Sequence, residues 1–421
     1  MKLQKIVNRL QKLHPKEIDL SLGRVKKLCE KLGNPQKKIL PISIVGTNGK
    51  QSTINVMFSI LKEAGIKSNI YTSPHIKKIN ERFVFNNNEI DDDELASLFQ
   101  EVEKINDNQP ITFFEILSAC FFYKAAQYPD NINLVEAGLF HRFDATNIFE
   151  NNLATIVTSI SKDHLDWLPE KEKTIEKIIY EKTSSLLDSK IIVSKQNPQK
   201  TTEIIKKTIS KNSSNKSFFN EDYSFSNGEN GFFYYEDKFG SLKLPIPNIL
   251  GQFQLENIST AIATLRLLDF DIKDDHIKNG ITKIKSIARL QEIKSGKLKR
   301  LVKYNRFIID GSHNEDGARV LNEYLQTLDC NKHVILGMMA NKDHEKYISF
   351  FKNIESFTTI DIPGQKNSIR GIDLKEKFKN ISNVKYKKSI EDAINSIPLK
   401  ENDLLIITGS LYLAGEVLNL N

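Results

Sequence analysis

Residues 42–53, with the sequence ISIVGTNGKQST, form the segment of the chain best suited to phosphate chemistry. An apolar run ends in the glycine-bearing stretch 46–50, and a helical pattern is expected from about Ser52. A strand that breaks on glycines and opens a helix directs backbone N–H groups toward the positive helix end, where phosphate binds well. Lys50 adds a point charge, and a hydroxyl from Ser52 or Thr53 can reach a phosphate-bound Mg²⁺.

This loop departs from the GxxxxGK[ST] pattern. Gly46 lies three residues before Gly49, and Gln51 separates Lys50 from Ser52. A tight turn between strand and helix, with no ligand, is the alternative interpretation. The strand before the loop and the helix after it favour phosphate binding. The loop therefore predicts a nucleotide, but not a particular reaction.

The elements that must position such residues alternate between strands and helices. Apolar strand patterns cover residues 42–45, 68–71, 132–135 and 154–158, and helical patterns cover about 52–64, 92–106, 112–128 and 171–187. This alternation predicts a mainly parallel, doubly wound sheet, in which ligands bind at the carboxyl ends of the strands. We therefore expect the side chains that follow four of these strands to lie in one cluster: Lys50, Ser73, Glu136 and His164.

The remainder of the chain changes character twice. Two helices are expected within residues 1–40, and residues 213–247 alternate polar and aromatic residues, which predicts β-hairpins. After a helix at about 251–268 and a linker near 294–297, a second strand–helix alternation begins. Its expected strands are 307–309, 333–336, 356–360 and 404–407, with helices from 315 and near 343–351 and 372–379. The predicted domains are 1–293 and 294–421.

Composition limits the class of protein. A chain of 421 residues can hold two domains with substantial cores, and a net charge of +7 suits anionic small molecules such as ATP or polycarboxylates. There is no dense basic run interleaved with aromatic residues, so no nucleic-acid partner is expected. The three cysteines are far apart, and neither a signal peptide nor a membrane-spanning run is evident. We expect a cytoplasmic protein without a membrane partner.

A series of short motifs runs along nearly the whole chain. They are LGNPQ at 32–36, GTNGK at 46–50, YTSPHIKKINERF at 71–83, TFFE at 112–115, FDATN at 143–147, DH at 163–164, EK at 181–182, ARLQ at 288–291, DGSHN at 310–314, GMMANKD at 337–343 and ITGSLYLAGEV at 407–417. In this order they resemble the folylpolyglutamate synthase/dihydrofolate synthase family, the folate branch of the Mur-type amide ligases.

The resemblance implies a P-loop Mur-ligase-type central domain with a mainly parallel sheet, followed by a smaller Rossmann-like C-terminal α/β domain. It also implies an ATP-dependent ligase. ATP would phosphorylate the carboxyl group of dihydropteroate or of a folate's last glutamate, and L-glutamate would then attack the acyl phosphate to form an amide. The expected cofactor is Mg²⁺, with two ions, and the resemblance leaves room for K⁺. A monomer is the family expectation.

The resemblance also carries roles to individual residues. Lys50, Lys182 and His164 would be catalytic. The Mg²⁺ ligands would be Ser73, Glu136, His164 and, if it is carbamylated, Lys182. The ATP contacts would be Gly46, Thr47, Asn48, Gly49, Lys50, Gln51, Ser52, Asn257, Arg289, Asp310 and His313. The pterin contacts would be Thr112, Phe113, Asp144 and Ala145.

Taken without the resemblance, several of these residues have an ordinary structural interpretation. Lys182 would be a solvated lysine on a helix, Asn257 a surface residue and Phe113 part of the core. Glu136 would serve equally well as a helix-capping acid, and His164 as a loop histidine with satisfied hydrogen bonds. For Lys182 the catalytic role depends wholly on the resemblance.

The sequence departs from the family pattern at several motif positions. These are Gln51, Phe140, His141, Ser161, Lys162, Thr183, Ser184 and Phe253. Two of them, Phe140 and His141, stand where the family has glycines, and glycine loss matters where the backbone needs positive φ or a close ligand approach. We expect a shifted substrate preference or slower turnover, with the fold intact.

Three other functions compete with this interpretation. Cell-wall members of the superfamily carry a domain before the P-loop, and the loop here begins at residue 46, which leaves no room for one. A P-loop ATPase or kinase would consume ATP without glutamate. A catalytically weakened homologue, or a regulator, would bind nucleotide without turnover. The second-domain motifs favour the ligase.

Overall fold

The computed structural model describes residues 2–16, 19–378 and 383–421. Contacts within the chain divide it into two compact units. The first comprises residues 1–160, 169–248 and 255–284, and the second comprises 161–168, 249–254 and 285–421. Two short segments of the first half, 161–168 and 249–254, thus belong to the second unit. The boundary that the sequence suggests between 293 and 294 lies inside the second unit, and the extent of each functional domain stays a prediction.

The first unit is built on an eight-stranded sheet with the strand order β4-β3-β2-β5-β1-β6-β7-β8. The pairs from β2 to β8 are parallel, and β3 and β4 add an antiparallel edge. The predicted mainly parallel sheet is therefore confirmed. Its strands are β1 (Pro41–Val45), β2 (Ser68–Tyr71), β3 (Phe83–Phe85), β4 (Asn88–Glu89), β5 (Ile132–Glu136), β6 (Ala154–Val157), β7 (Lys190–Val193) and β8 (Lys216–Phe218).

Within the described residues, two helices of the first unit precede β1, and the others lie between or after the strands in the chain. They are α1 (Lys2–Leu10), α2 (Gly23–Lys31), α3 (Lys50–Glu63), α4 (Asp92–Asn106), α5 (Phe113–Ala125), α6 (Ile175–Thr183), α7 (Lys200–Thr208), α8 (Phe253–Leu267) and α9 (Asp274–Ile281). Two differ from expectation at their starts. Helix α3 begins at Lys50 because Gly49, in the left-handed region, is its N-cap. Helix α6 is shorter than 171–187 because the side chain of Thr174 accepts the N–H of Lys177 and caps it.

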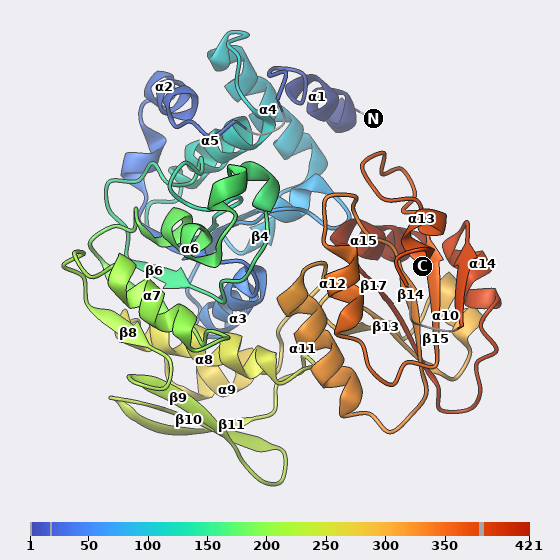
Figure 1. Cartoon of the computed structure of the whole chain (residues 1–421). Coiled ribbons are helices and arrows are strands. Elements are labelled where there is room, and N and C mark those ends of the chain that lie inside the picture. Colours follow the sequence, from blue (N-terminus) through green and yellow to red (C-terminus); the bar gives the residue numbers. More distant parts are fainter. Residues whose placement is uncertain (1, 17–18, 379–382) are drawn as a thin grey trace. The chain divides into compact units, whose positions relative to one another are not determined.

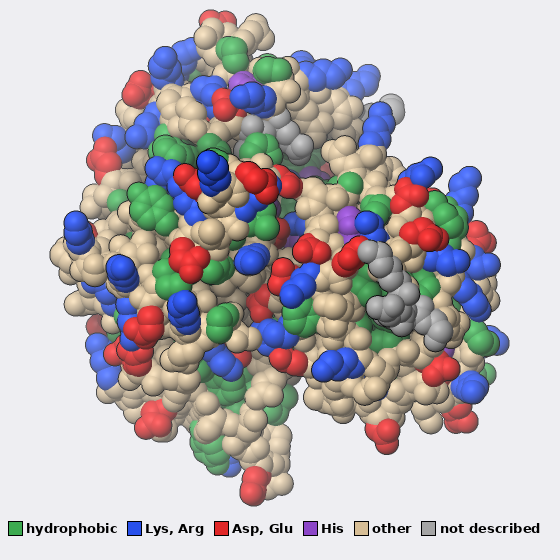
Figure 2. All heavy atoms as spheres, in the orientation of Figure 1, with side chains coloured by type: hydrophobic (Ala, Val, Ile, Leu, Met, Phe, Trp, Pro, Cys, Tyr) green, Lys and Arg blue, Asp and Glu red, His purple; other side chains and the backbone are tan. Residues whose placement is uncertain are grey.

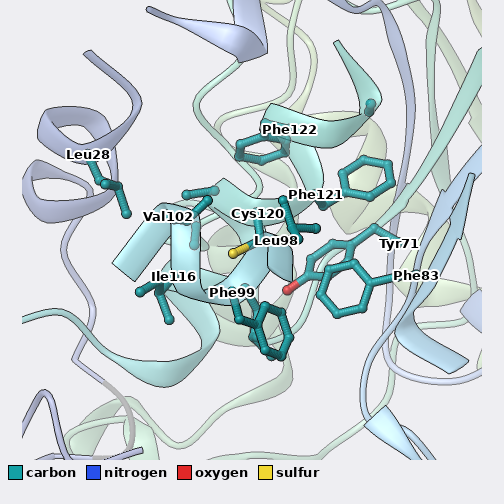
Figure 3. Packing of buried hydrophobic residues seen from close by; sticks show 14 of the residues in the cluster. Leu28, Tyr71, Phe83, Leu98, Phe99, Val102, Ile116, Cys120, Phe121 and Phe122 are labelled. Carbon is teal, nitrogen blue, oxygen red and sulfur yellow. The ribbon is translucent and has the colours of Figure 1, made fainter. Parts of the chain in front are cut away.

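Aromatic packing fixes one face of this sheet (Figure 3). Tyr71 at the end of β2 stacks on Phe121 of α5 with ring centroids 5.2 Å apart, and it also packs against Phe83. Helix α5 is buried over most of its length and carries Cys120 into the same cluster. Ring stacking adds to area burial, so the carboxyl end of β2, which leads to Ser73, is rigidly held.

The predicted hairpins within 213–247 are confirmed as a separate antiparallel sheet of strands β9 (Tyr223–Asn227), β10 (Phe232–Asp237) and β11 (Gly240–Pro245). Figure 1 shows this sheet in yellow-green below β8 and α8 of the same unit.

The second unit holds a six-stranded sheet with the order β12-β13-β17-β14-β15-β16, parallel except for β12. Its strands are β12 (Gln291–Glu292), β13 (Arg306–Ile309), β14 (Lys332–Leu336), β15 (Ser356–Ile360), β16 (Val384–Lys387) and β17 (Leu404–Thr408). Its helices are α10 (Lys297–Val302), α11 (Glu315–Gln326), α12 (His344–Ser349), α13 (Gly371–Lys375), α14 (Ile390–Asn395) and α15 (Leu411–Leu420). The helix expected at 372–379 is observed as α13, and residue 379 lies outside the described residues.

The surface of each unit carries both signs of charge. Figure 2 shows lysine and arginine side chains interspersed with aspartate and glutamate on the visible face. None of the described helices has the length and apolar character that a membrane crossing would require.

Candidate active site

The P-loop connects β1 to α3 in the first unit. The N–H groups of Thr47 and Asn48 donate to the carbonyl of Ser159, at 2.8 and 3.1 Å, so the loop is tied to the end of β6. Lys50 folds back, and its Nζ donates to the carbonyls of Gly46 and Thr47, both at 3.2 Å. The loop thus has the shape of a phosphate cradle with its lysine at the mouth.

Both glycines of the loop are required by their neighbours. Gly46 has φ +145°, and a Cβ there would lie 2.0 Å from Oγ1 of Thr158. Gly49 has φ +88°, and a Cβ there would lie 2.5 Å from Oδ1 of Asn257. The second contact also places Asn257, a predicted ATP contact on α8, directly beside the P-loop.

Glu136 ends β5, which pairs with β1 and β2, and it is the buried carboxylate of this site. Its Oε2 accepts the backbone N–H of Ser73 at 3.0 Å, and its Oε1 lies 3.8 Å from Nζ of Lys50. Three of the four residues that follow strand ends therefore come together as predicted. His164, the fourth, belongs to the second unit.

Lys182 is buried, with 3% of its surface exposed, although a solvated lysine was the expectation from its residue type. The correction has a clear cause. The last turn of α6 faces the P-loop, so Nζ of Lys182 donates to the carbonyl of Gly46 at 2.8 Å, and the same atom lies 5.7 Å from the ring centroid of Phe140. Lys50 and Lys182 thus share one carbonyl acceptor.

The two residues that stand in place of family glycines are also buried here. Phe140 has φ +55°, a backbone conformation that is strained for a bulky side chain. His141 is 4% exposed, and its Nδ1 finds no hydrogen-bond partner among the described residues. Burial, together with the charge of Lys182, lowers the pKa of His141 to about 3. The imidazole beside Lys182 is therefore neutral.

The predicted pterin contacts are Thr112 and Phe113 at the start of α5, and Asp144 and Ala145 in the segment after β5. Thr112 caps α5 in a reciprocal pair with Glu115, whose Oε2 accepts from both N and Oγ1 of Thr112 at 2.8 Å. Asp144 is buried and accepts the N–H groups of Gly138 and Leu139 at 2.9 and 2.8 Å. Phe113 is partly buried against the core cluster. The carboxylates of Glu115 and Asp144 are thus used in hydrogen bonds within the chain. The ring of Phe113 is the group that could stack on a pterin.

In the second unit, the predicted ATP contacts Arg289 and Asp310 belong to one loop arrangement. Asp310 follows β13, and its carboxylate accepts the backbone N–H of Leu290 at 2.9 Å and that of Ser312 at 2.9 Å. The residues on either side of Arg289, Ala288 and Leu290, both have positive φ. The sharp turn that results sets Arg289 next to the end of β13.

Asp163 connects two further predicted residues of this unit. Its Oδ1 accepts the N–H of His164 at 2.8 Å, and its Oδ2 lies 3.5 Å from Nε2 of His313. Lys342 donates to Oδ1 at 2.6 Å and Asn314 donates to Oδ2 at 3.2 Å. Sequence reasoning gave no role to Asp163, Lys342 or Asn314, although all three stand in quoted motifs.

The donor set suits a hard cation. Among the described residues no group of three or more His, Cys, Asp or Glu side chains could hold a metal ion. A cation here would need hydroxyl, water or nucleotide oxygens besides the carboxylate, which is how Mg²⁺ is bound beside phosphates. Glu136, buried at the P-loop with Ser73 next to it, fits that description.

Cavity size does not point to this chemistry. A cavity of about 650 Å³ lies between β8 and the hairpin sheet, lined by residues such as Lys190, Asp222 and Phe239. None of the predicted site residues lines it. The P-loop geometry, and not this cavity, therefore locates the candidate site.

Comparison with known proteins agrees with this geometry. The family described as "Dihydrofolate synthetase, C-terminal domain" matches residues 295–420. A dihydrofolate synthase/folylpolyglutamate synthase of Bacillus subtilis is 30% identical over 424 residues, which covers 94% of each chain. The protein of that name from Haemophilus influenzae is 27% identical and covers 97% of this chain and 94% of its own.

The fold agrees as well. The structure of Escherichia coli FolC in complex with DHPP and ADP superposes with a TM-score of 0.87 at 26% identity, covering 99% of this chain and 97% of that one. Two findings agree. The mainly parallel sheet carries a P-loop with a lysine beside a buried carboxylate, and the B. subtilis relative is 30% identical over 94% of this chain. The chain belongs to the dihydrofolate synthase/folylpolyglutamate synthase family of ATP-dependent ligases.

Proposed function

We propose that this protein uses ATP to activate the carboxyl group of dihydropteroate or of a folate's terminal glutamate, and joins it to the amino group of L-glutamate with release of ADP and phosphate. The observation that carries the proposal is the convergence of Lys50, Ser73 and Glu136 at the carboxyl ends of neighbouring strands. The structure of E. coli FolC in complex with DHPP and ADP supports the binding of a nucleotide together with a second small molecule.

The chain's own residues would act mainly by binding and charge. Backbone N–H groups and Lys50 would hold the β- and γ-phosphates, and Asn257 beside Gly49 would contact the nucleotide. Arg289, Asp310 and His313 would hold other parts of ATP from the second unit. Phe113 would stack on the pterin, with Asp144 and Ala145 shaping the loop beside it.

Ser73, Glu136 and His164 would hold Mg²⁺, and a carbamylated Lys182 would hold a second ion. When bound, Mg²⁺ neutralises phosphate charge and so lets two anions approach. A carbamate on Lys182 would lie beside the P-loop, because the buried amine is 2.8 Å from the carbonyl of Gly46. Intact-mass measurement in bicarbonate buffer, with Lys182→Met as the blank, tests this assignment.

A purified-protein assay tests the function. ATP, Mg²⁺ and glutamate are supplied with dihydropteroate or tetrahydrofolate in separate reactions, phosphate release is followed, and products are identified by mass spectrometry. Lys50→Ala is expected to abolish turnover with the circular dichroism spectrum unchanged. The matched control is Lys62→Ala, since Lys62 is exposed in the last turn of the same helix.

The outcome separates the ligase from its rivals. Phosphate release that needs both glutamate and a pteroate or folate supports the ligase. Release without glutamate would identify an ATPase or kinase instead, and nucleotide binding without any release would identify a catalytically weakened homologue.

A further inference from the structure

The buried carboxylate of Asp163 lies at the centre of a network within the second unit. Its side chain is 7% exposed, and that of its partner Lys342 is 13% exposed. An ionised carboxylate in such surroundings must be compensated by charge or hydrogen bonds. Lys342 at 2.6 Å supplies the charge.

The network joins three loops. Segment 161–168 carries Asp163, the loop after β13 carries His313 and Asn314, and the loop after β14 carries Lys342. Asn314 is also the N-cap of α11, because its Oδ1 accepts the N–H of Gly317 at 2.9 Å while its amide donates to Asp163. A single carboxylate thus fixes loops at the carboxyl ends of two strands to a third segment.

His164 depends on this carboxylate for its backbone conformation. It has φ +57°, which is unusual for a residue other than glycine, and its N–H donates to Asp163 at 2.8 Å. His313 is held from both sides: Nδ1 lies 2.9 Å from the carbonyl of Gly311, to which it must donate, and Nε2 faces Asp163. Asp163 therefore contacts the backbone of His164 and the ring of His313.

We infer that Asp163, neutralised by Lys342, is a positioning residue that holds the backbone of His164 and the ring of His313 in the arrangement that the active site uses. The part of this inference that concerns catalysis rests on the proposed function, in which His164 binds Mg²⁺ and His313 contacts ATP. Partners that orient a metal-binding histidine typically affect metal affinity or activity about 10–100-fold when they are removed.

The chain offers a matched control in Asp403. It too is a buried carboxylate of the second unit, with an asparagine at 3.0 Å (Asn331), a histidine at 3.2 Å (His333) and a backbone N–H at 2.7 Å (that of Lys400). It immediately precedes β17, at the end of the sheet opposite the predicted site residues. Asp163→Asn and Asp403→Asn are therefore alike in chemistry and differ in location.

The experiment has one readout that does not depend on enzyme activity. In protein labelled with ¹³C at histidine Cε1, Asp163→Asn should shift the ring signals of His164 and His313, assigned through His164→Gln and His313→Gln. Asp403→Asn should leave these two signals in place and shift that of His333. If the two signals stay unchanged in Asp163→Asn, the inference is overturned, whatever the enzyme does.

The second readout is kinetic. Asp163→Asn should lower kcat about 10-fold or more and raise the Mg²⁺ concentration for half-maximal rate by a similar factor, and Lys342→Met should act in the same direction. Asp403→Asn should change thermal stability without that change in Mg²⁺ dependence. If Asp163→Asn and Asp403→Asn lost equal amounts of kcat and of Mg²⁺ dependence, Asp163 would have a merely structural role, and the inference would be overturned. If the wild type has no glutamate-dependent turnover, the proposed function fails, and the histidine signals alone decide the inference.

Discussion

Replacing Phe140 by glycine sets two structural effects against each other. The backbone at this position has φ +55°, which costs about 1–3 kcal/mol for a residue that is not glycine. Glycine would relieve this strain. The ring, however, is only 3% exposed and lies against Nζ of Lys182. Truncating a buried phenylalanine costs about 3–5 kcal/mol, and glycine adds about 0.4–1 kcal/mol of unfolded-state entropy.

The sum favours destabilisation. With packing lost, unfolded-state entropy gained and strain relieved, Phe140→Gly should lower the free energy of unfolding by about 3 kcal/mol. The assay is urea unfolding followed by far-ultraviolet circular dichroism, with the transitions of the two compact units fitted separately. Asn230→Gly is the matched control, because Asn230 also has positive φ but is exposed, and its midpoint should move little.

A midpoint that rises in Phe140→Gly would refute this reasoning, since strain would then outweigh packing. Activity supplies a second test of the same position. The ring covers Lys182, so the variant should also change the ratio of rates with dihydropteroate and tetrahydrofolate. An unchanged ratio would show that Phe140 has no part in substrate preference.

Three further predictions concern stability. Burial lowers the pKa of His141 to about 3 and that of His75 to about 4. Below about pH 6.5 the unfolded chain therefore binds protons that the folded chain does not. As the pH falls from there, the free energy of unfolding should decrease by up to about 1.4 kcal/mol per pH unit for each histidine. His141→Gln should flatten the dependence of urea midpoints on pH. Thr112→Ala should lower the free energy of unfolding by about 1 kcal/mol in the same assay, because it removes the N-cap of α5. Thr112→Ser keeps the capping hydroxyl and should stay close to the wild type. Arg142→Lys should lower the free energy of unfolding by about 1 kcal/mol, because an ammonium cannot reproduce the two hydrogen bonds from the guanidinium to Glu181 at 2.8 and 2.7 Å. Equal urea midpoints for this variant and the wild type would contradict this prediction.

The sheet was predictable because its strands are buried on both faces. Strand β2 matches its predicted bounds, and β5 and β6 differ from theirs by one residue, because continuous apolar runs ended by polar residues mark buried parallel strands. The convergence of Lys50, Ser73 and Glu136 was predictable because the carboxyl ends of parallel strands lie at the same edge of a sheet. Strand β16 has the sequence VKYK, a partly exposed edge strand with two lysines, and no apolar run marked it.

Long-range contacts explain what sequence reasoning missed. Lys342 meets Asp163 across a separation of 179 residues, and Asn314 meets it across 151. No local period or spacing encodes such a pair, so the available signals were that all three residues stand in the quoted motifs and that Asp163 precedes His164. The burial of Lys182 was equally hidden, because it depends on the P-loop carbonyl of Gly46, which is 136 residues away.

The shared acceptor of the two site lysines suggests how the P-loop can receive a phosphate at low cost. Lys50 and Lys182 both donate to the carbonyl of Gly46, at 3.2 and 2.8 Å, while Glu136 lies 3.8 Å from Lys50. These ammonium groups are satisfied before any ligand arrives, so they need not be buried without partners. A phosphate oxygen carries negative charge, so it attracts an ammonium more strongly than a neutral carbonyl oxygen does. Exchange of the Gly46 carbonyl for phosphate is therefore downhill for Lys50. An unmodified Lys182, which is closer to that carbonyl, can remain in place to hold the loop while the nucleotide binds.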